Sequence, residues 1–423
     1  MDQMNSLAKK TDRPTRVVIC CDHGAPAETL RDAVTVGSAL MERGHEIAFI
    51  TGDPISLIEA AGSWVPSDIF EAPVRRAVAN LVMKPRAIDG FADFMAISGF
   101  DDKAALVVLA SLWDRQLKAL KPDVIIGFYS PLLWLVAPGH APTFALGSGL
   151  MLPPTLGTTF PRLTADSTPL ADETLMLNNA NAVLARYGRK ELAALSEVLD
   201  RCATILYGVP AFDPYLQVRR TLSAGLLGEE PTPTVPPAKQ RLAIFLDVYC
   251  PNVEQVVLAI GSVNDILIDI CVSGITTGMR RFLEEQPHVK VWSDYASLLS
   301  NAANASALVH HGVQDVAQRC ISLGRPQLVI PWTHEQHIFN LTVEGMRFTW
   351  TKPPDTAIHD MAGTFSALLR DSSLAVEAQH QARQLASMNM PDALPDIIER
   401  IEEAHGRASF ALHGTAGYNR API

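Results

Sequence analysis

Short apolar runs alternate with amphipathic stretches along much of the chain. In the first half, strands are predicted at 16–21, 45–51, 124–128 and 143–146, with a helix at about 26–43 and helix or loop at 68–120 and 150–200. Gly44 lies between a helical pattern and an apolar run, as is typical of a helix end that leads directly into a strand. This alternation predicts a doubly wound α/β domain with a parallel sheet.

The same rhythm restarts after a proline-rich stretch without periodicity, GEEPTPTVPPAK at 228–239, which is typical of an interdomain linker. Strands are predicted beyond it at 242–248, 266–272 and 289–292, and helices at about 253–262, 277–285, 357–370, 374–388 and 393–405. We therefore expect an N-terminal domain at 1–228, a linker at 229–240, a second domain at 241–390, a helix at 391–405 and a tail at 406–423.

Composition narrows the class of protein. A chain of 423 residues, 48% apolar and 19% charged, is too long for one ordinary core and is typical of α/β proteins with buried strands. A net charge of −10 without a basic stripe argues against nucleic-acid binding. The six cysteines show no C-x-x-C spacing, which favours reduced core residues of a cytoplasmic protein.

Membrane insertion is not expected. The first 16 residues are polar and contain no apolar stretch typical of a signal peptide. The longest apolar stretch, 124–138, is interrupted by Pro131 and is shorter than the roughly 20 residues that span a bilayer. Peripheral contact with a membrane surface stays open.

The segment 311–336, HGVQDVAQRCISLGRPQLVIPWTHEQ, carries the main functional signal. An apolar stretch at 307–309 is followed by His310, His311 and Gly312. A helix of about ten residues is predicted next, and it ends at Gly324. A second buried strand is predicted at 326–331. In such a βαβ unit a diphosphate binds at the helix N-terminus, which falls near Gln314.

This segment resembles the donor-binding signature of the family 1 glycosyltransferases, the UDP-glycosyltransferase superfamily with the GT-B fold. Measured from His311, the family spacing is kept at Gly324, Pro326, Pro331 and the pair Glu335–Gln336. Upstream, Trp292 followed by Leu298 and Leu299 is similar to the family's W-x-P-Q-x-x-L-L run. The resemblance implies two Rossmann-like domains that face each other across a cleft, with the last helix returning to the first domain.

The resemblance also implies a donor site. Its residues would be Trp292, His311, Gly312, Gln314, Asp315, Arg319, Glu335 and Gln336. His311 would contact the diphosphate, the Glu335–Gln336 pair the sugar hydroxyls, and Trp292 the nucleobase. The alternatives are a capped histidine at a strand end, a solvated loop pair and a core tryptophan, and His310 is expected to be structural.

The general base of the family is a histidine in the loop after the first strand, oriented by an aspartate after a later strand. Here CCDHGAP places His23 in that loop, but the expected aspartate aligns with Phe128. Asp22 is adjacent in sequence, and neighbours on an extended chain point apart. His23 is therefore either the catalytic base, together with His311 as the second catalytic residue, or a loop or acceptor contact.

Four departures from the family pattern affect the donor loop. Val313 replaces a glycine and predicts a reshaped loop, Val316 replaces a serine or threonine that meets phosphate, and Arg319 replaces a glutamate that holds the ribose. Asp315 adds a negative charge, which at an effective dielectric near 20 costs on the order of 4 kcal/mol beside a phosphate about 4 Å away. Arg319, one turn further along the helix, is predicted either to neutralise it or to reach the diphosphate directly.

The leading hypothesis is an inverting, metal-independent hexosyltransferase of secondary metabolism. It would use a UDP- or dTDP-sugar as co-substrate, no other cofactor, and a small, apolar natural-product or lipid acceptor. The alternative is a catalytically silent homologue that binds a ligand or activates a partner. A different nucleotide-sugar enzyme, such as an epimerase, is disfavoured by the Glu335–Gln336 pair.

Overall fold

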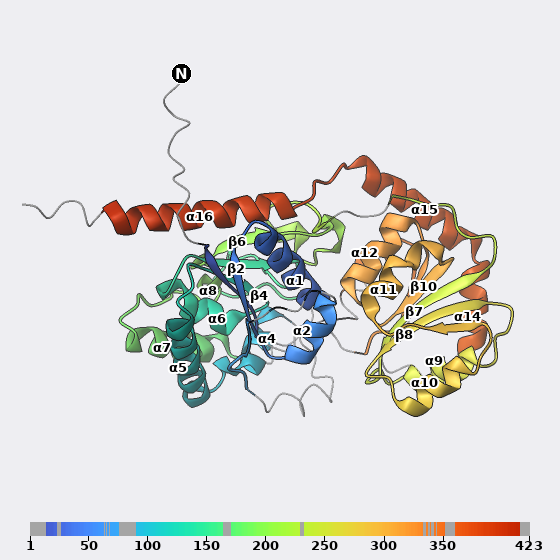
Figure 1. Cartoon of the computed structure of the whole chain (residues 1–423), viewed down its shortest axis with the longest axis horizontal. Helices are drawn as coiled ribbons and strands as arrows, with labels where there is room; N and C mark the ends of the chain where they lie inside the picture. The colour runs from blue at the N-terminus through green and yellow to red at the C-terminus, as the bar shows by residue number, and fades with distance from the viewer. Residues whose placement is uncertain are drawn as a thin grey trace, which may run out of the picture.

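The protein consists of two parallel six-stranded sheets, each the centre of one domain, as seen in the computed structural model (Figure 1). The structure describes residues 14–22, 27–62, 64, 66, 68–75, 90–163, 171–228, 232–332, 336, 339, 342–343, 345–351 and 360–414. The predicted α/β class is confirmed, with two doubly wound, Rossmann-like domains.

The first sheet has the strand order β3-β2-β1-β4-β5-β6. Its strands are β1 (Arg16–Cys21), β2 (Glu46–Thr51), β3 (Asp68–Glu71), β4 (Val124–Phe128), β5 (Thr143–Gly147) and β6 (Ala203–Leu206). Its helices are α1 (Ala27–Glu42), α2 (Pro54–Ala61), α4 (Phe91–Met95), α5 (Lys103–Leu120), α6 (Pro131–Val136), α7 (Glu173–Arg186) and α8 (Glu197–Asp200). The edge strand β3 corrects the expectation of only helix or loop at 68–120, because three half-buried residues and one exposed residue leave no periodic signal.

The second sheet has the order β12-β11-β10-β7-β8-β9. Its strands are β7 (Arg241–Asp247), β8 (Leu267–Ser273), β9 (Val289–Val291), β10 (Ala307–His310), β11 (Gln327–Val329) and β12 (Thr349–Thr351). Its helices are α9 (Val253–Ile260), α10 (Thr277–Glu284), α11 (Tyr295–Ser300), α12 (Gln314–Leu323), α14 (Met361–Arg370) and α15 (Ser372–Ser387). Strand order reverses between β1 and β4 in one sheet and between β7 and β10 in the other, and ligands bind at such reversal points.

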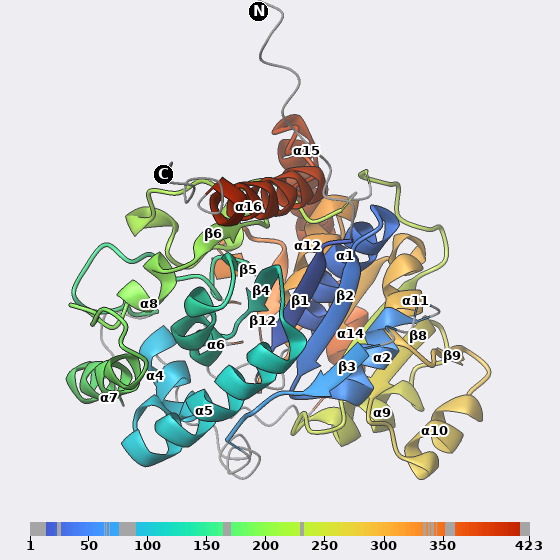
Figure 2. The same ribbon diagram turned by 60° about the vertical axis from the view of Figure 1, so that its left-hand side comes forward.

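The central strands bury both of their faces, which explains why they are continuous apolar runs. In β1, Val18 and Cys20 pack into one core, whereas Val17, Ile19 and Cys21 pack into another on the opposite face of the sheet. Helices α5, α6 and α7 cover the first core, and α1 contributes to the second (Figure 2). Alternate residues of β1 thus pack against helices on opposite faces of the sheet, which gives a domain of three layers, helix, sheet and helix.

The last helix, α16 (Leu394–Gly414), belongs to the first domain although α15 before it lies with the second (Figure 1). Ile397, Ile398 and Ile401 are buried in the same core as β1. The helix continues to Gly414, so the predicted tail beginning at residue 406 was set too early. None of the described helices is both long enough and apolar enough to cross a membrane.

Two chain segments run between the domains, and they pair with each other. The Leu226 amide donates to the Pro391 carbonyl at 2.9 Å, and the Ala393 amide donates to the Leu226 carbonyl at 2.7 Å. The described part of the linker is held against the second domain by the fully buried Arg325, whose guanidinium donates to the carbonyl and the hydroxyl of Thr234 at 2.8 and 2.7 Å. The domains are thus joined by a paired double connection.

Candidate functional site

His311 lies at the strand-order reversal of the second sheet, directly after β10 and beside the end of β7. Its neighbour His310 pairs in register with Phe245 of β7. Burial lowers the pKa of His311, while Asp247 and the Phe245 backbone favour its charged form. Nδ1 of His311 is buried and has no hydrogen-bond partner in the described part of the chain. This position therefore offers a neutral imidazole where a ligand is expected.

His310 has the structural role that the sequence predicted. Its Nδ1 accepts the amide protons of Gly312 at 3.2 Å and Val313 at 3.1 Å, so the ring proton lies on Nε2 and is donated to Gln327 at 2.8 Å. Burial lowers the pKa of His310 to about 3. A neutral, buried ring thus fixes the turn that leads into α12.

The donor loop accommodates Val313 without strain. Residue 313 has φ −84° and ψ 122°, an extended conformation open to β-branched side chains. Gly312 has φ +102° instead, in a region that favours glycine. The positive φ of this turn falls one residue before the valine, so Val313 itself requires no special loop shape.

Val316 does not face a ligand. Its side chain is fully buried in the core formed by α11, α12 and the neighbouring strands. A hydroxyl at this position would lie among apolar side chains. Val316 in place of the serine or threonine of the family pattern therefore changes the core of the domain as well as the loop.

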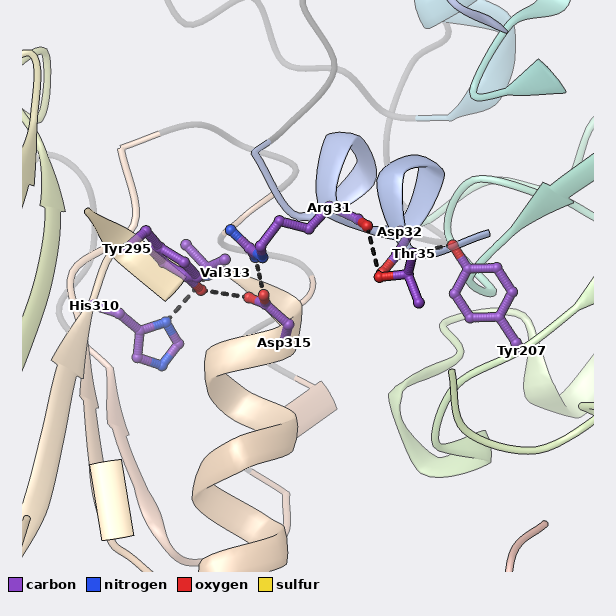
Figure 3. Close-up of polar contacts among 8 residues, drawn as sticks. All are labelled: Arg31, Asp32, Thr35, Tyr207, Tyr295, His310, Val313 and Asp315. Carbon is purple, nitrogen blue, oxygen red and sulfur yellow. Dashed lines mark hydrogen bonds and ion pairs between the residues drawn. The ribbon is translucent and has the colours of Figure 1, made fainter. Parts of the chain in front are cut away.

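Asp315, in the first turn of α12, is neutralised from the other domain. Arg31 of α1 forms an ion pair with its Oδ2, and the Tyr295 hydroxyl donates to its Oδ1 at 2.5 Å (Figure 3). The Arg31 guanidinium also lies over the Tyr295 ring, 3.9 Å from Cζ to the ring centroid. The predicted Asp315–Arg319 pair is wrong, because the Asp315 carboxylate turns towards Arg31 of α1 and Tyr295 of α11 instead. Direct contact of Arg319 with a diphosphate stays a prediction.

Gln314 brings the first domain close to the same helix end. Its amide nitrogen lies 3.4 Å from the position that a Cβ atom on Gly208, just after β6, would occupy. The Gln336 side chain accepts the Trp332 amide at 3.1 Å. His23 and Glu335 lie outside the described residues, so their roles stay predictions.

Trp292 is fixed on two sides. Its indole N–H donates to Asp269 at 3.0 Å, and the Lys290 ammonium lies 3.5 Å from the ring centroid. A nucleobase could therefore stack only on the opposite face of the ring. This contact, too, stays a prediction.

The corresponding edge of the first sheet is apolar and aromatic. Phe128, which ends β4 where the family has an aspartate, is fully buried in the core. Tyr129 follows with φ +50°, an uncommon conformation that concentrates at functional sites, and stacks on Phe94 with ring centroids 3.8 Å apart. The Ser130 hydroxyl links this edge to β1, because it accepts the Asp22 amide at 3.1 Å.

A half-buried acid on α1, Asp32, was not expected from the sequence. Asp32 accepts a hydrogen bond of 2.5 Å from the Tyr207 hydroxyl (Figure 3). Burial raises the pKa of Asp32 to about 6, although Tyr207 and Arg31 oppose the shift. Nothing in the local pattern distinguishes Asp32 or Arg31 from ordinary polar helix residues.

Among the residues that the structure describes, no cluster of three or more His, Cys, Asp or Glu is placed to hold a metal ion.

The sequence is similar to a known glycosyltransferase over part of its length. No family model matches the sequence. The elloramycin glycosyltransferase ElmGT of Streptomyces olivaceus is 34% identical over 122 residues, a match that spans 28% of this chain and only 29% of ElmGT.

Similar solved structures span nearly the whole chain. The calicheamicin glycosyltransferase CalG4 superimposes with a TM-score of 0.62 at 16% identity, covering 93% of this chain and 99% of CalG4. The spinosyn rhamnosyltransferase SpnG, complexed with spinosyn aglycone, gives 0.59 at 16%, covering 91% and 100%. The glycosyltransferase VinC, in complex with dTDP, gives 0.55 at 15%, covering 92% and 100%. The resemblance to glycosyltransferases is thus confirmed in the fold.

Proposed function

We propose that this protein is a glycosyltransferase that moves a hexose from a nucleotide-diphosphate sugar to a small natural-product acceptor. The observation that carries the proposal is the neutral His311 imidazole at the strand-order reversal of the second sheet, next to the first turn of α12. VinC binds dTDP and SpnG binds a spinosyn aglycone, and both have this fold. These neighbours favour a dTDP- or UDP-sugar and an apolar acceptor.

The proposed reaction is a single displacement with inversion. The acceptor hydroxyl attacks the anomeric carbon of the sugar, the bond from that carbon to the diphosphate oxygen breaks, and the hydroxyl proton passes to a base. His311 and the first amides of α12 stabilise the charge that develops on the leaving diphosphate, so the reaction needs no divalent ion. We assign the base to His23, and the apolar edge around Tyr129 to the acceptor.

A thermal-shift panel tests the donor class. UDP, dTDP, GDP and ADP, with their sugars, are added to the purified chain, and a ligand at 100 times its Kd stabilises by about 2.7 kcal/mol. We expect a shift with dTDP or UDP. No shift with any nucleotide would overturn the proposal. Binding without turnover towards a range of aglycones would favour the silent homologue.

The role of His311 is tested by His311→Ala. Loss of one group that stabilises developing negative charge lowers turnover by roughly 10² to 10³. His380→Ala is the matched control, because His380 is exposed on α15 of the same domain. Equal turnover in the two variants would remove His311 from the site. Activity retained in EDTA would support the metal-independent reaction.

A further inference from the structure

Arg31 is a cation that the first domain places at the donor end of the second. It lies on α1, its side chain is 16% exposed, and it pairs with Asp315 in the first turn of α12 (Figure 3). The contact joins residues 284 positions apart in the chain. A partly buried charge pair of this kind is stronger than one on an open surface.

The Arg31 guanidinium has N–H groups that do not contact Asp315. Only Nη2 contacts Asp315, and the described part of the chain provides no hydrogen-bond acceptor for Nε or Nη1. The Tyr295 ring covers one face of the group at 3.9 Å and holds it in place. The planar fork of an arginine binds two oxygen atoms at once, which suits phosphate as well as carboxylate.

Asp315 creates a need for such a cation. A diphosphate at the α12 N-terminus would face the Asp315 carboxylate, at a cost on the order of 4 kcal/mol if that charge were not neutralised. The buried Val316 offers the phosphate no hydroxyl. Arg31 both offsets the Asp315 charge and adds hydrogen-bonding N–H groups at the same helix end.

We propose that Arg31 binds the diphosphate of the nucleotide sugar directly, through the guanidinium N–H groups that Asp315 leaves unused. This inference rests on the proposed function and deepens it, because the first domain then contributes to the donor site. Donor binding is thereby coupled to contact between the two domains. The Asp315 carboxylate orients Arg31 before the donor arrives.

Four proteins separate direct binding from simple neutralisation of Asp315: the parent, Arg31→Gln, Asp315→Asn and the double variant. Isothermal calorimetry measures the Kd of dTDP and UDP, and of thymidine and uridine, for each. We expect Arg31→Gln to weaken diphosphate binding by about 10- to 100-fold, the loss typical of a charge-assisted contact, with nucleoside binding unchanged. In the Asp315→Asn background the same change should still weaken diphosphate binding at least about tenfold.

The outcome that overturns the inference is specific. If the double variant binds diphosphates as tightly as Asp315→Asn alone, Arg31 serves only to neutralise Asp315. Failure of the parent to bind any nucleoside diphosphate would instead overturn the proposed function and this inference with it. Unchanged nucleoside affinity shows that a variant is folded.

Two further variants serve as controls. Arg31→Lys keeps the charge but loses the fork, and should retain part of the diphosphate affinity. Arg43→Gln removes a charge directly after the end of α1, where Arg43 is exposed and pairs with Glu402, and should leave diphosphate binding unchanged. A loss in Arg43→Gln equal to that in Arg31→Gln would show a general effect of charge and overturn direct contact.

Discussion

The carbonyl oxygen of Pro391 lies 2.1 Å from the position that a Cβ atom on Gly225 would occupy. Only glycine lets the two interdomain segments approach so closely, and Gly225 also has φ +132°. The paired connection at Leu226 follows directly after this contact.

Gly225→Ala is therefore expected to destabilise the protein by about 2–4 kcal/mol, through a backbone clash added to conformational strain. Gly228→Ala is the matched control, because Gly228 also has a positive φ but no atom within 4 Å of a Cβ position. Urea unfolding measures both. Equal losses in the two variants would show that strain alone, without the approach to Pro391, explains the effect.

Acid should weaken the fold through His310. The pKa of this ring is about 3 when folded and close to 6.5 when unfolded, so the unfolded chain binds the extra proton. The contribution of His310 to stability is complete above pH 6.5 and is lost as pH falls towards 3. At pH 5.5 the loss is about 1 kcal/mol.

Unfolding free energies at pH 7.5 and 5.5 check this prediction. His310→Gln should be less stable at neutral pH and should depend less on pH than the parent, whereas His380→Gln should keep the parental dependence. The same pH dependence in His310→Gln and the parent would contradict the assignment.

Arg325 should be essential for holding the linker. Its guanidinium donates to Thr234, to the Ala305 carbonyl at 2.6 Å and to the Leu323 carbonyl at 2.9 Å. Burial lowers its pKa. Arg325→Leu leaves these carbonyls without their donor and should cost roughly 3 kcal/mol.

The control for Arg325 is Arg281→Leu, which removes a largely exposed arginine of α10 that pairs with Glu285. Such a pair contributes at most about 1 kcal/mol. Thermal unfolding distinguishes the two variants. A melting temperature unchanged by Arg325→Leu would show that the linker does not depend on this residue.

Restoring the family residue at position 316 should not restore a phosphate contact. Val316→Thr buries a hydroxyl in an apolar core and is expected to cost about 1–3 kcal/mol without tightening dTDP or UDP binding. Val313→Thr, at a partly exposed position of the same loop, should be nearly neutral in stability. Tighter diphosphate binding by Val316→Thr would show that this side chain faces the donor after all.

The sequence by itself determined the repeating βα order, the two sheets and the position of α12. These features follow from local causes: apolar runs define buried strands, and Gly324, with φ +69°, ends the helix where the pattern places it. The structural role of His310 was also predictable, because it follows a buried strand and precedes the turn into α12.

Only the tertiary structure decided which charges meet. Asp315 pairs with Arg31 of the other domain, although the nearer Arg319 is the better candidate when only helical spacing is known. The short strands β3 and β12 likewise depend on pairing with strands elsewhere in the sequence. Local patterns specify the secondary structure of a segment, whereas a contact between residues 284 positions apart depends on how two finished domains pack.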